Sequence, residues 1–464
     1  MTAGDPLFAR SALSRTLAWR DGRPIGVQRF LAQAAALAER LPAEGQPVNL
    51  CSDRYLFLLG FVAGLMRGQM SLLPPNAMPQ TLRQVAQPGA TPYALVDDAL
   101  QDTGGLHAIA LSHDDAAPAV DAAAQIPTFH PELWSACLLT SGSTGVPQPQ
   151  QRRWRALTLS IEAERRSLAH LLDWPTIDGL NIVATVPAQH SYGFESSVLL
   201  ALLGGAAFDV GRPFYPADIA EALDRLPRPR ALVTTPVHLK ALLGSGLGAL
   251  PAVDLVLSAT APLSPQMAQQ AEQALGGRTL EIYGCTEAGQ VAARRTTAGE
   301  VWTTLGDLRL HVEHSGDGER FIVSGGHVLQ PTPLADLLEL IDAQHFRLLG
   351  RANDLIHVAG KRSSLAHLNF HLNRIAGVQD GAFWLPDDVP EGVVRLVAFV
   401  VAPTLSARQI TDALRREVEA AFVPRRVVHV DRLPREATGK LTTQRLREFA
   451  LQTLARVGSD TSRR

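Results

Sequence analysis

Hydrophobic positions from the N-terminus to Gly289 follow two alternating patterns. Residues 27–41 carry apolar side chains every three or four positions, and residues 55–67 are apolar almost throughout, so both segments predict helices. Short apolar runs that predict strands lie at 47–51, 70–73, 94–96, 126–129, 135–139, 182–186, 231–234, 255–258 and 279–282. Strands separated by helices favour mostly parallel sheets whose faces are covered by helices.

After Gly289 the strand-like segments become short and follow one another without helices between them. The segments at 301–305, 308–312 and 320–323, with a glycine-rich turn at 316–318, predict an antiparallel meander.

A third pattern begins near residue 353, where strand-like and helical segments mix. Strands are predicted at 355–358, 395–401 and 427–430, and helices at 365–375, 407–422 and 442–456. The expected fold is therefore α/β. A large N-terminal domain over residues 1–352 would hold the helix-covered, mostly parallel sheets and the small antiparallel meander. A small, mobile α+β C-terminal domain would follow over residues 353–464.

Composition and charge exclude several classes of partner. The 464 residues include 43 Lys and Arg against 45 Asp and Glu, and this net charge of −2 gives no field that would attract nucleic acid or an anionic membrane. The longest apolar stretches, 57–66 and 196–208, are shorter than the roughly 20 residues of a membrane span. Three separated cysteines without metal-ligand spacing predict reduced thiols. We expect a cytoplasmic protein without a membrane span, as a monomer or homodimer.

The most informative local pattern is LLTSGSTGVP at residues 138–147, directly after the strand predicted at 135–139. Glycines let the backbone approach a ligand closely, successive N–H groups can form an anion-binding nest, and hydroxyls add donors for phosphate oxygens. A flexible surface turn is the alternative interpretation, but an unbroken TSGSTG run after a buried strand favours a phosphate loop. The loop is not a Walker A motif, because GxxxxGK[ST] is absent.

Four further segments follow this loop, and they are SATAPL at 258–263, YGCTE at 283–287, GRANDLIHVAGKR at 350–362 and LPREATGKL at 433–441. In this order the five segments resemble the signature motifs of the adenylate-forming superfamily. That superfamily includes acyl-CoA synthetases, aryl-acid ligases and the adenylation domains of nonribosomal peptide synthetases. The resemblance spans nearly the whole chain. The compact size and the segment QHSYGFESSVLL at 189–200 also resemble the stand-alone carrier-protein ligases of aryl-polyene pigment clusters.

The resemblance implies an ATP-dependent, Mg²⁺-requiring ligase that activates an aryl or fatty acid. A carboxylate is a poor electrophile, so its attack on the α-phosphate of ATP converts it into an acyl-adenylate with release of pyrophosphate. The acyl group would then pass to a thiol, either coenzyme A or the phosphopantetheine arm of an acyl carrier protein. Most of what the protein must supply is positioning and charge neutralisation.

The family motifs assign a role to particular residues of this chain. Lys440 would bridge the carboxylate and the α-phosphate, Thr286 would contact the α-phosphate, and Glu287 would bind Mg²⁺, for which one carboxylate suffices. Tyr283 would lie over the adenine, and Asp336 would bind both ribose hydroxyls. The nucleotide-binding residues implied in this way are Thr140, Ser141, Gly142, Ser143, Thr144, Gly145, Thr260, Ala261, Pro262, Tyr283, Gly284, Asp336 and Arg351.

The same motifs imply an acid pocket and a hinge. The residues expected to line the pocket are His190, Gly193, Ala259 and Cys285. The hinge and thiol path would comprise Asn353, Gly360 and Arg362.

The chain departs from the family pattern where the loop normally continues with a lysine. Gln148 stands at that position, and Arg152 or Arg153 offers a replacement charge. Asn353 replaces the first hinge aspartate, and Leu334-Ala335 stand where the family has Thr-Gly. These departures leave a second hypothesis open, in which the chain is a non-catalytic or single-step relative that binds AMP or an acyl-adenylate.

Overall fold

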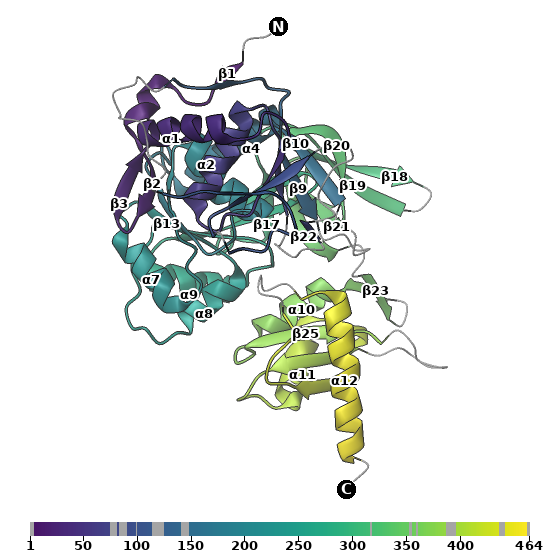
Figure 1. Cartoon of the computed structure of the whole chain (residues 1–464). Coiled ribbons are helices and arrows are strands. Elements are labelled where there is room, and N and C mark those ends of the chain that lie inside the picture. The colour runs from purple at the N-terminus through teal and green to yellow at the C-terminus, as the bar shows by residue number, and fades with distance from the viewer. Residues whose placement is uncertain are drawn as a thin grey trace.

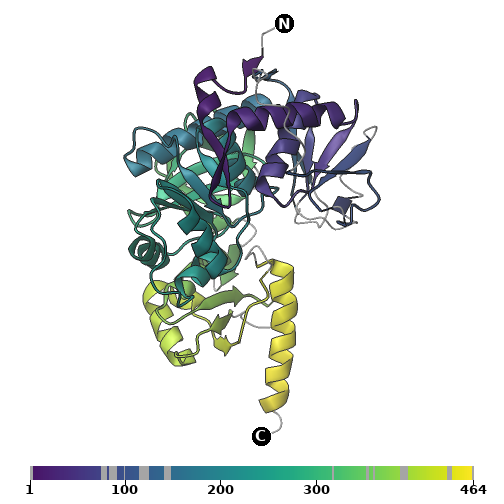
Figure 2. The same cartoon turned by 60° about the vertical axis from the view of Figure 1, so that its left-hand side comes forward.

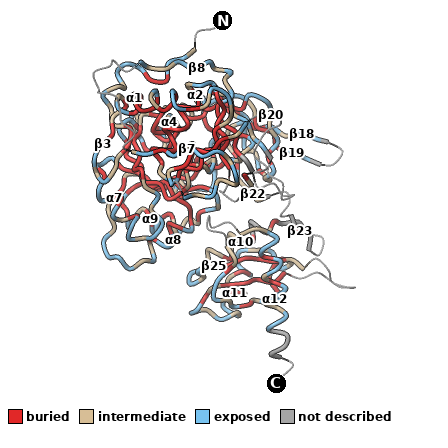
Figure 3. The backbone as a smooth tube through the Cα atoms, in the orientation of Figure 1, coloured by how far each residue is buried: buried red, intermediate tan, exposed pale blue. Residues whose placement is uncertain are grey.

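The computed structural model describes residues 4–74, 81–82, 91–98, 100–113, 125–140, 148–315, 318–351, 355–358, 361–386, 396–435 and 441–461. These residues form a large N-terminal domain of mixed sheets and a small C-terminal domain (Figures 1 and 2). Buried residues gather inside the N-terminal domain and, separately, inside the C-terminal domain (Figure 3). The predicted fold class is therefore confirmed.

The first sheet of the N-terminal domain has the strand order β10-β9-β5-β4-β6-β7. Its strands are β4 (Gln46–Asn49), β5 (Ser71–Leu73), β6 (Pro92–Val96), β7 (Ala108–Ala110), β9 (Trp134–Thr140) and β10 (Gln148–Arg153). All neighbours are parallel except β10, which pairs antiparallel with β9. A short two-stranded sheet of β1 (Asp5–Pro6) and β8 (Thr128–Phe129) lies apart from it.

Helices α1 (Val27–Arg40) and α2 (Arg54–Met66) form where the apolar pattern predicts them. Helix α2 begins at an aspartate cap, because the Asp53 carboxylate accepts hydrogen bonds from the N–H groups of Tyr55 and Leu56, both 2.9 Å away. Its side chains are buried from Arg54 to Leu65. Helix α2 is apolar on all sides, and this pattern therefore predicts its burial correctly.

The second sheet is larger, with the order β21-β22-β17-β16-β15-β14-β13-β11-β12-β2-β3. The strands are β2 (Thr16–Arg20), β3 (Arg23–Gly26), β11 (Asn181–Ala184), β12 (Ala207–Asp209), β13 (Arg230–Thr234), β14 (Leu255–Ser258), β15 (Arg278–Cys285), β16 (Gly289–Arg295), β17 (Val301–Thr304), β21 (Asp336–Leu340) and β22 (His345–Arg351). Pairing is parallel from β15 through β14, β13, β11 and β12 to β2, and antiparallel at both ends.

Helices cover both faces of the parallel centre, as the alternating pattern predicts. Val183, Leu232 and Val256 point to one face, where they pack with α7 (Pro216–Arg225), α8 (Pro236–Leu243) and α9 (Pro265–Leu275). The intervening residues of the same strands join the main core beneath α4. On that side lie α4 (Trp154–Leu172), the short α5 (Ser191–Gly193), the π-helix η2 (Phe194–Leu199) and α6 (Leu200–Gly204).

The antiparallel meander is present, but one of its predicted strands belongs elsewhere. The meander consists of β18 (Arg309–Ser315), β19 (Gly318–Gly325) and β20 (Val328–Leu334). The segment predicted at 301–305 is instead β17 of the large sheet. There Trp302 and Thr304 face the core while Val301 and Thr303 are exposed, so β17 suits a half-buried antiparallel extension. Of the predicted turn, residues 316–317 lie outside the described residues.

The C-terminal domain contains the hairpin β23 (Leu355–Val358) and β24 (Lys361–Ser364), and a three-stranded sheet, β25-β26-β27. The sheet strands are β25 (Asp380–Trp384), β26 (Val397–Val401) and β27 (Arg426–His429). The helices are α10 (Leu365–Arg374), α11 (Ala407–Glu417) and α12 (Thr443–Thr461), and α12 stands along one side of this domain in Figure 2.

One long helix predicted at 407–422 is shorter than expected. Helix α11 ends at Glu417, because Val418 is extended, with φ −128° and ψ 155°. A separate 3₁₀ turn, η4 (Ala420–Phe422), follows and delivers Phe422 into the core beside Ile410 and Leu414. A second 3₁₀ turn, η1 (Arg10–Ser14), lies near the N-terminus. Among the helices that the structure describes, none combines the length and apolar character that a membrane crossing requires.

Candidate active site

The YGCTE segment forms a tight hairpin at the end of β15. Tyr283, Gly284 and Cys285 end that strand, and three residues lead into β16, where Cys285 pairs with Gly289. A Cβ atom on Gly284 would lie 2.4 Å from the Gly289 carbonyl oxygen, so only glycine permits this approach. The hairpin carries Thr286, half-buried, and Glu287, exposed, at its tip.

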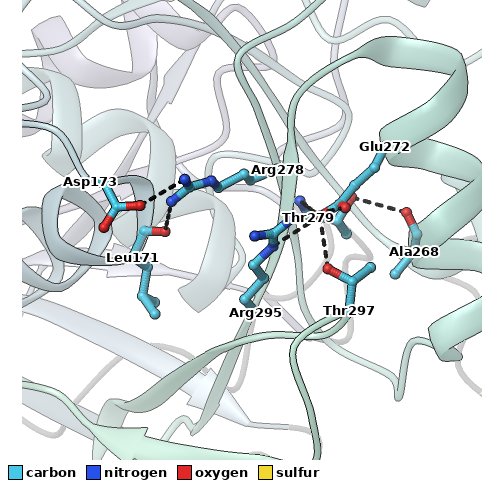
Figure 4. A network of polar contacts seen from close by, with 8 residues as sticks. All are labelled: Leu171, Asp173, Ala268, Glu272, Arg278, Thr279, Arg295 and Thr297. Carbon is cyan, nitrogen blue, oxygen red and sulfur yellow. Dashed lines mark hydrogen bonds and ion pairs between the residues drawn. The ribbon is translucent and has the colours of Figure 1, made fainter.

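Strand β15 is fixed firmly at its other end (Figure 4). The carboxylate of Glu272 on α9 accepts hydrogen bonds from the N–H of Thr279 at 2.9 Å and from the guanidinium of Arg295 at 3.1 Å. Arg278 pairs with Asp173, just after α4, at 2.7 Å. The strand that carries the YGC residues is therefore held to α9, β16 and the end of α4.

Tyr283 and Asp336 meet beside this hairpin. The Tyr283 hydroxyl donates to Oδ2 of Asp336 at 2.8 Å, and its ring packs on Trp302 and Phe346, with centroids 5.9 and 5.6 Å away. Asp336 starts β21, and its Cα pairs with that of Arg351 at the end of β22. The structure thus brings together three residues that the sequence assigns to the nucleotide, although only the backbone of Arg351 is described.

The SATAPL segment leaves the end of β14 through a strained residue. Thr260 has a φ of +76°, which is costly for a β-branched side chain, and such strain is characteristic of functional sites. Ala259 before it is buried, and Thr260 itself is exposed. The loop is held by Glu281, whose carboxylate accepts from the Leu263 N–H at 2.9 Å and pairs with Arg294 at 2.6 Å. Ala261 and Pro262 lie within this fixed loop.

Two residues predicted for the acid pocket lie where β11 leads into α5. His190 is exposed just before α5. Gly193 is buried, and a Cβ atom there would lie 2.0 Å from the Pro187 carbonyl oxygen. Close packing of α5 on the preceding loop therefore accounts for this glycine.

Cys285 lies within the hairpin beside these segments. Burial raises the pKa of its thiol to about 12, and the neighbouring Glu287 carboxylate adds to the rise. The thiol is therefore protonated near pH 7.

Several predicted residues lie outside what the structure describes. These are Ser141, Gly142, Ser143, Thr144, Gly145, Asn353, Gly360 and Lys440. For Thr140 and Arg362 only the backbone is described, at the end of β9 and within β24. Gln148 begins β10, where its Cα pairs with that of Thr140, so the predicted phosphate loop connects two antiparallel strands.

The two arginines after the predicted loop have different environments. Arg153 forms an ion pair with Glu132 at 2.8 Å and stacks on Trp134, with its guanidinium 4.2 Å from the ring centroid. Arg152 instead donates to the carbonyl oxygen of Thr286 in the hairpin turn. Arg152 therefore belongs to the site, and Arg153 does not contact it.

Besides Glu281, the structure buries carboxyl groups on η2 and α4 that the sequence analysis did not identify. Glu195 on η2 is 3% exposed, and it accepts from Ser191 at 2.9 Å and from Ser160 at 3.2 Å. Burial raises its pKa, and the charge of Arg152 opposes that rise. Glu164 on α4 is fully buried. The sequence did indicate that Glu164 is buried, because its spacing from Ile161 and Leu168 puts it on the apolar face of the helix.

We expect the buried Glu164 to make stability depend on pH. Burial raises its pKa from 4.5 to about 8, so the folded protein holds a proton that the unfolded chain releases within this window. Glu164 should therefore lower the free energy of unfolding as pH rises from 4.5 to 8, by up to about 5 kcal/mol. Thermal melts across this range isolate this contribution as the difference between wild type and Glu164→Gln, because buried histidines such as His327 contribute equally to both. An identical pH dependence in the variant and the wild type would contradict the assignment.

Comparison with known proteins identifies the family to which these segments correspond. Residues 56–313 match the model for AMP-binding enzymes, and residues 372–440 match that for the AMP-binding enzyme C-terminal domain. A 4-coumarate–CoA ligase from Rhodobacter capsulatus is 32% identical over 300 residues, which cover 64% of this chain and 71% of the relative.

Solved structures show the same fold over nearly the whole chain. ATP-bound MatB from Rhodopseudomonas palustris superimposes with a TM-score of 0.77 at 20% identity, over 96% of this chain and 99% of MatB. The o-succinylbenzoate CoA synthetase of Bacillus subtilis, in complex with its acyl-adenylate intermediate, gives a TM-score of 0.75 at 18% identity. That match covers 97% of this chain and 98% of the synthetase.

Proposed function

The chain belongs to the AMP-binding enzyme family of AMP-forming acid–thiol ligases, and from this premise we propose the following reaction. The enzyme uses ATP to convert an aryl or fatty acid into its acyl-adenylate, releases pyrophosphate, and transfers the acyl group to a thiol. Coenzyme A and the phosphopantetheine arm of an acyl carrier protein are the two acceptors that fit this chemistry.

The contact between Tyr283 and Asp336 is the observation that carries this proposal. These residues are 53 positions apart, and the hydrogen bond between them joins the proposed adenine platform to the proposed ribose ligand. A carboxylate that accepts one hydrogen bond from Tyr283 keeps lone pairs for a vicinal diol. The strained Thr260 loop and the hairpin tip would complete the nucleotide site, because each follows the end of one of two adjacent parallel strands, β14 and β15.

The side chains at the hairpin tip also fit a magnesium ion. Glu287 offers an exposed carboxylate, and no group of three or more His, Cys, Asp or Glu residues suited to a metal occurs among the described residues. Mg²⁺ is commonly held by one or two carboxylates together with substrate phosphates and water, so a single carboxylate is sufficient. Glu287 would hold the ion, which when bound neutralises charge on the phosphate oxygens.

The protein residues then have separate tasks in the proposed reaction. The Thr286 hydroxyl orients the α-phosphate, and the loop at 140–145 surrounds the outgoing pyrophosphate. Lys440 places its ammonium between the attacking carboxylate and the α-phosphate, where negative charge develops.

We also propose that the C-terminal domain begins at residue 353 and rotates about Asn353 after adenylation. The approaching thiol would then pass Gly360 and Arg362. The acid itself would lie beside His190, Ala259 and Cys285.

The reaction can be tested by ATP–pyrophosphate exchange with a panel of aryl and fatty acids. We expect exchange with at least one acid, and thioester formation when CoA or a phosphopantetheinylated carrier protein is added. A thioester with the carrier protein alone would support the likeness to aryl-polyene ligases. Absence of exchange with every acid would contradict the proposed reaction.

The absence of the loop lysine at Gln148 favours a second candidate, a nucleotide-binding relative without turnover. For such a protein, calorimetry with ATP would show binding without any exchange.

A further inference from the structure

Arg152 connects the first sheet to the YGCTE hairpin of the second sheet. It lies near the end of β10, and its Nη2 donates to the main-chain carbonyl oxygen of Thr286. Neighbouring residues of a strand face opposite sides of the sheet, and the register of β10 against β9 shifts between Arg152 and Arg153. Arg152 therefore points to the hairpin, whereas Arg153 pairs with Glu132 at the surface.

We propose that Arg152 is a positioning residue for adenylation, which holds the Thr286–Glu287 turn in place through the Thr286 carbonyl. This inference rests on the proposed function. Arg152 acts through the main chain of the turn, so the Thr286 side chain remains available for the α-phosphate. A hydrogen bond from a charged donor is roughly twice as strong as a neutral one, which suits it to fixing a short turn.

A buried carboxyl group interacts with Arg152. Glu195 is 3% exposed, burial raises its pKa, and the positive charge of Arg152 opposes that rise. Glu195 also accepts hydrogen bonds from Ser191, which follows His190, and from the N–H of Gln290 on β16. The two side chains thus contact both ends of the hairpin turn, Arg152 at Thr286 and Glu195 at Gln290.

The space around Gly289 shows how closely this arrangement is packed. A Cβ atom on Gly289 would lie 3.4 Å from Oε2 of Glu195 and 3.9 Å from Nη2 of Arg152. Gly289 has a φ of +79°, which allows the chain to leave the turn without a side chain between the two charges.

The neighbouring groups do not compete with Arg152 for this role. His327 donates from Nε2 to the Gln290 carbonyl oxygen at 2.8 Å, and burial lowers its pKa to about 4. Its imidazole is therefore neutral near pH 7. Glu164, whose pKa burial raises to about 8, is protonated there. Arg152 is then the positively charged group of this cluster, and its charge opposes the effect of burial on the pKa of Glu195.

The alternative role for Arg152 is to replace the missing loop lysine and contact the pyrophosphate. The two roles predict different kinetics. A positioning role acts on the adenylation transition state and lowers kcat, whereas a contact with bound pyrophosphate changes the KM for pyrophosphate.

The test compares Arg152→Met with Arg153→Met in the full-length enzyme. Both variants exchange an arginine for an apolar side chain of similar length, on adjacent residues of one strand. With the preferred acid in ATP–pyrophosphate exchange, we expect Arg152→Met to lower kcat by about 10- to 100-fold, with the KM values for ATP and pyrophosphate within about twofold. Arg153→Met should retain wild-type kinetics, and Arg152→Lys should recover most of the lost kcat.

Equal kcat values for wild type and Arg152→Met would overturn this inference, and so would a rise in the KM for pyrophosphate with kcat retained. If Arg152→Met does not fold, the isosteric Glu195→Gln decides. We expect it to lower kcat by roughly 3- to 10-fold with an unchanged KM for ATP, and a wild-type kcat overturns the inference. If the wild-type enzyme shows no exchange with any acid, the proposed function is wrong. That result differs from a failure of the Arg152 inference, which requires an active wild type.

Discussion

Lys440→Ala is expected to abolish acyl-adenylate formation, while thioester formation from a supplied acyl-adenylate continues near the wild-type rate. Lys440 lies outside the described residues, and its role follows from its place in the LPREATGKL motif. An ammonium between the attacking carboxylate and the α-phosphate stabilises charge that develops only during adenylation. Removal of one such electrostatic donor costs about 100- to 1,000-fold in kcat.

The two half-reactions should be measured separately, the first by ATP–pyrophosphate exchange and the second with a synthetic acyl-adenylate and thiol. Lys240→Ala on α8 is the matched control, because it removes another lysine at a position without an assigned role. Equal losses in both half-reactions would contradict the role of Lys440. Wild-type exchange in Lys440→Ala would do so as well.

Asp336→Ala should raise the KM for ATP by about 100-fold and leave kcat near the wild-type value. A carboxylate that accepts from both ribose hydroxyls contributes roughly 3 kcal/mol, since each such charged hydrogen bond is worth about 1.5 kcal/mol or more. The ribose does not react, so this contact stabilises the ground state and the transition state equally. Steady-state exchange kinetics over a range of ATP concentrations provide the measurement.

Asp336→Ala also removes the carboxylate that accepts from the Tyr283 hydroxyl. Tyr283→Phe separates this effect from the loss of the proposed ribose contact. The phenylalanine ring keeps its packing on Trp302 and Phe346. We therefore expect its KM for ATP to rise by less than about fivefold. If Tyr283→Phe and Asp336→Ala raised the KM equally, the carboxylate would serve the tyrosine and not the nucleotide.

The sequence predicted the layered fold because the parallel strands and covering helices carry strong local patterns. Helix α2 is apolar on all sides, and β11, β13 and β14 each contain a run of three apolar residues, so each pattern identified its element. The strand β17 was assigned to the wrong sheet, because antiparallel pairing depends on partners distant in the chain. The pairing of β17 with β22 joins residues more than forty positions apart, and no local pattern records it.

The candidate site was predictable where motifs are contiguous and not where contacts come from separate elements. YGCTE gave Tyr283, Thr286 and Glu287 as candidates, the family motifs gave Asp336, and the structure places Tyr283 in contact with Asp336. The sequence offered Arg152 and Arg153 as equivalent replacements for a lysine, and only the strand geometry separates them. Glu195 escaped notice because its role depends on burial beside Arg152, which sequence spacing does not indicate.

The protonated thiol of Cys285 has a consequence for an enzyme that makes an activated acyl group. An acyl-adenylate is an electrophile, and a thiolate next to it would capture the acyl group and inactivate the protein by self-acylation. Burial raises the pKa of the Cys285 thiol and so lowers the fraction present as the reactive thiolate. At the proposed acid pocket, this shift would make the hairpin's own sulfur less reactive and would leave the acyl group for the thiol that arrives from outside.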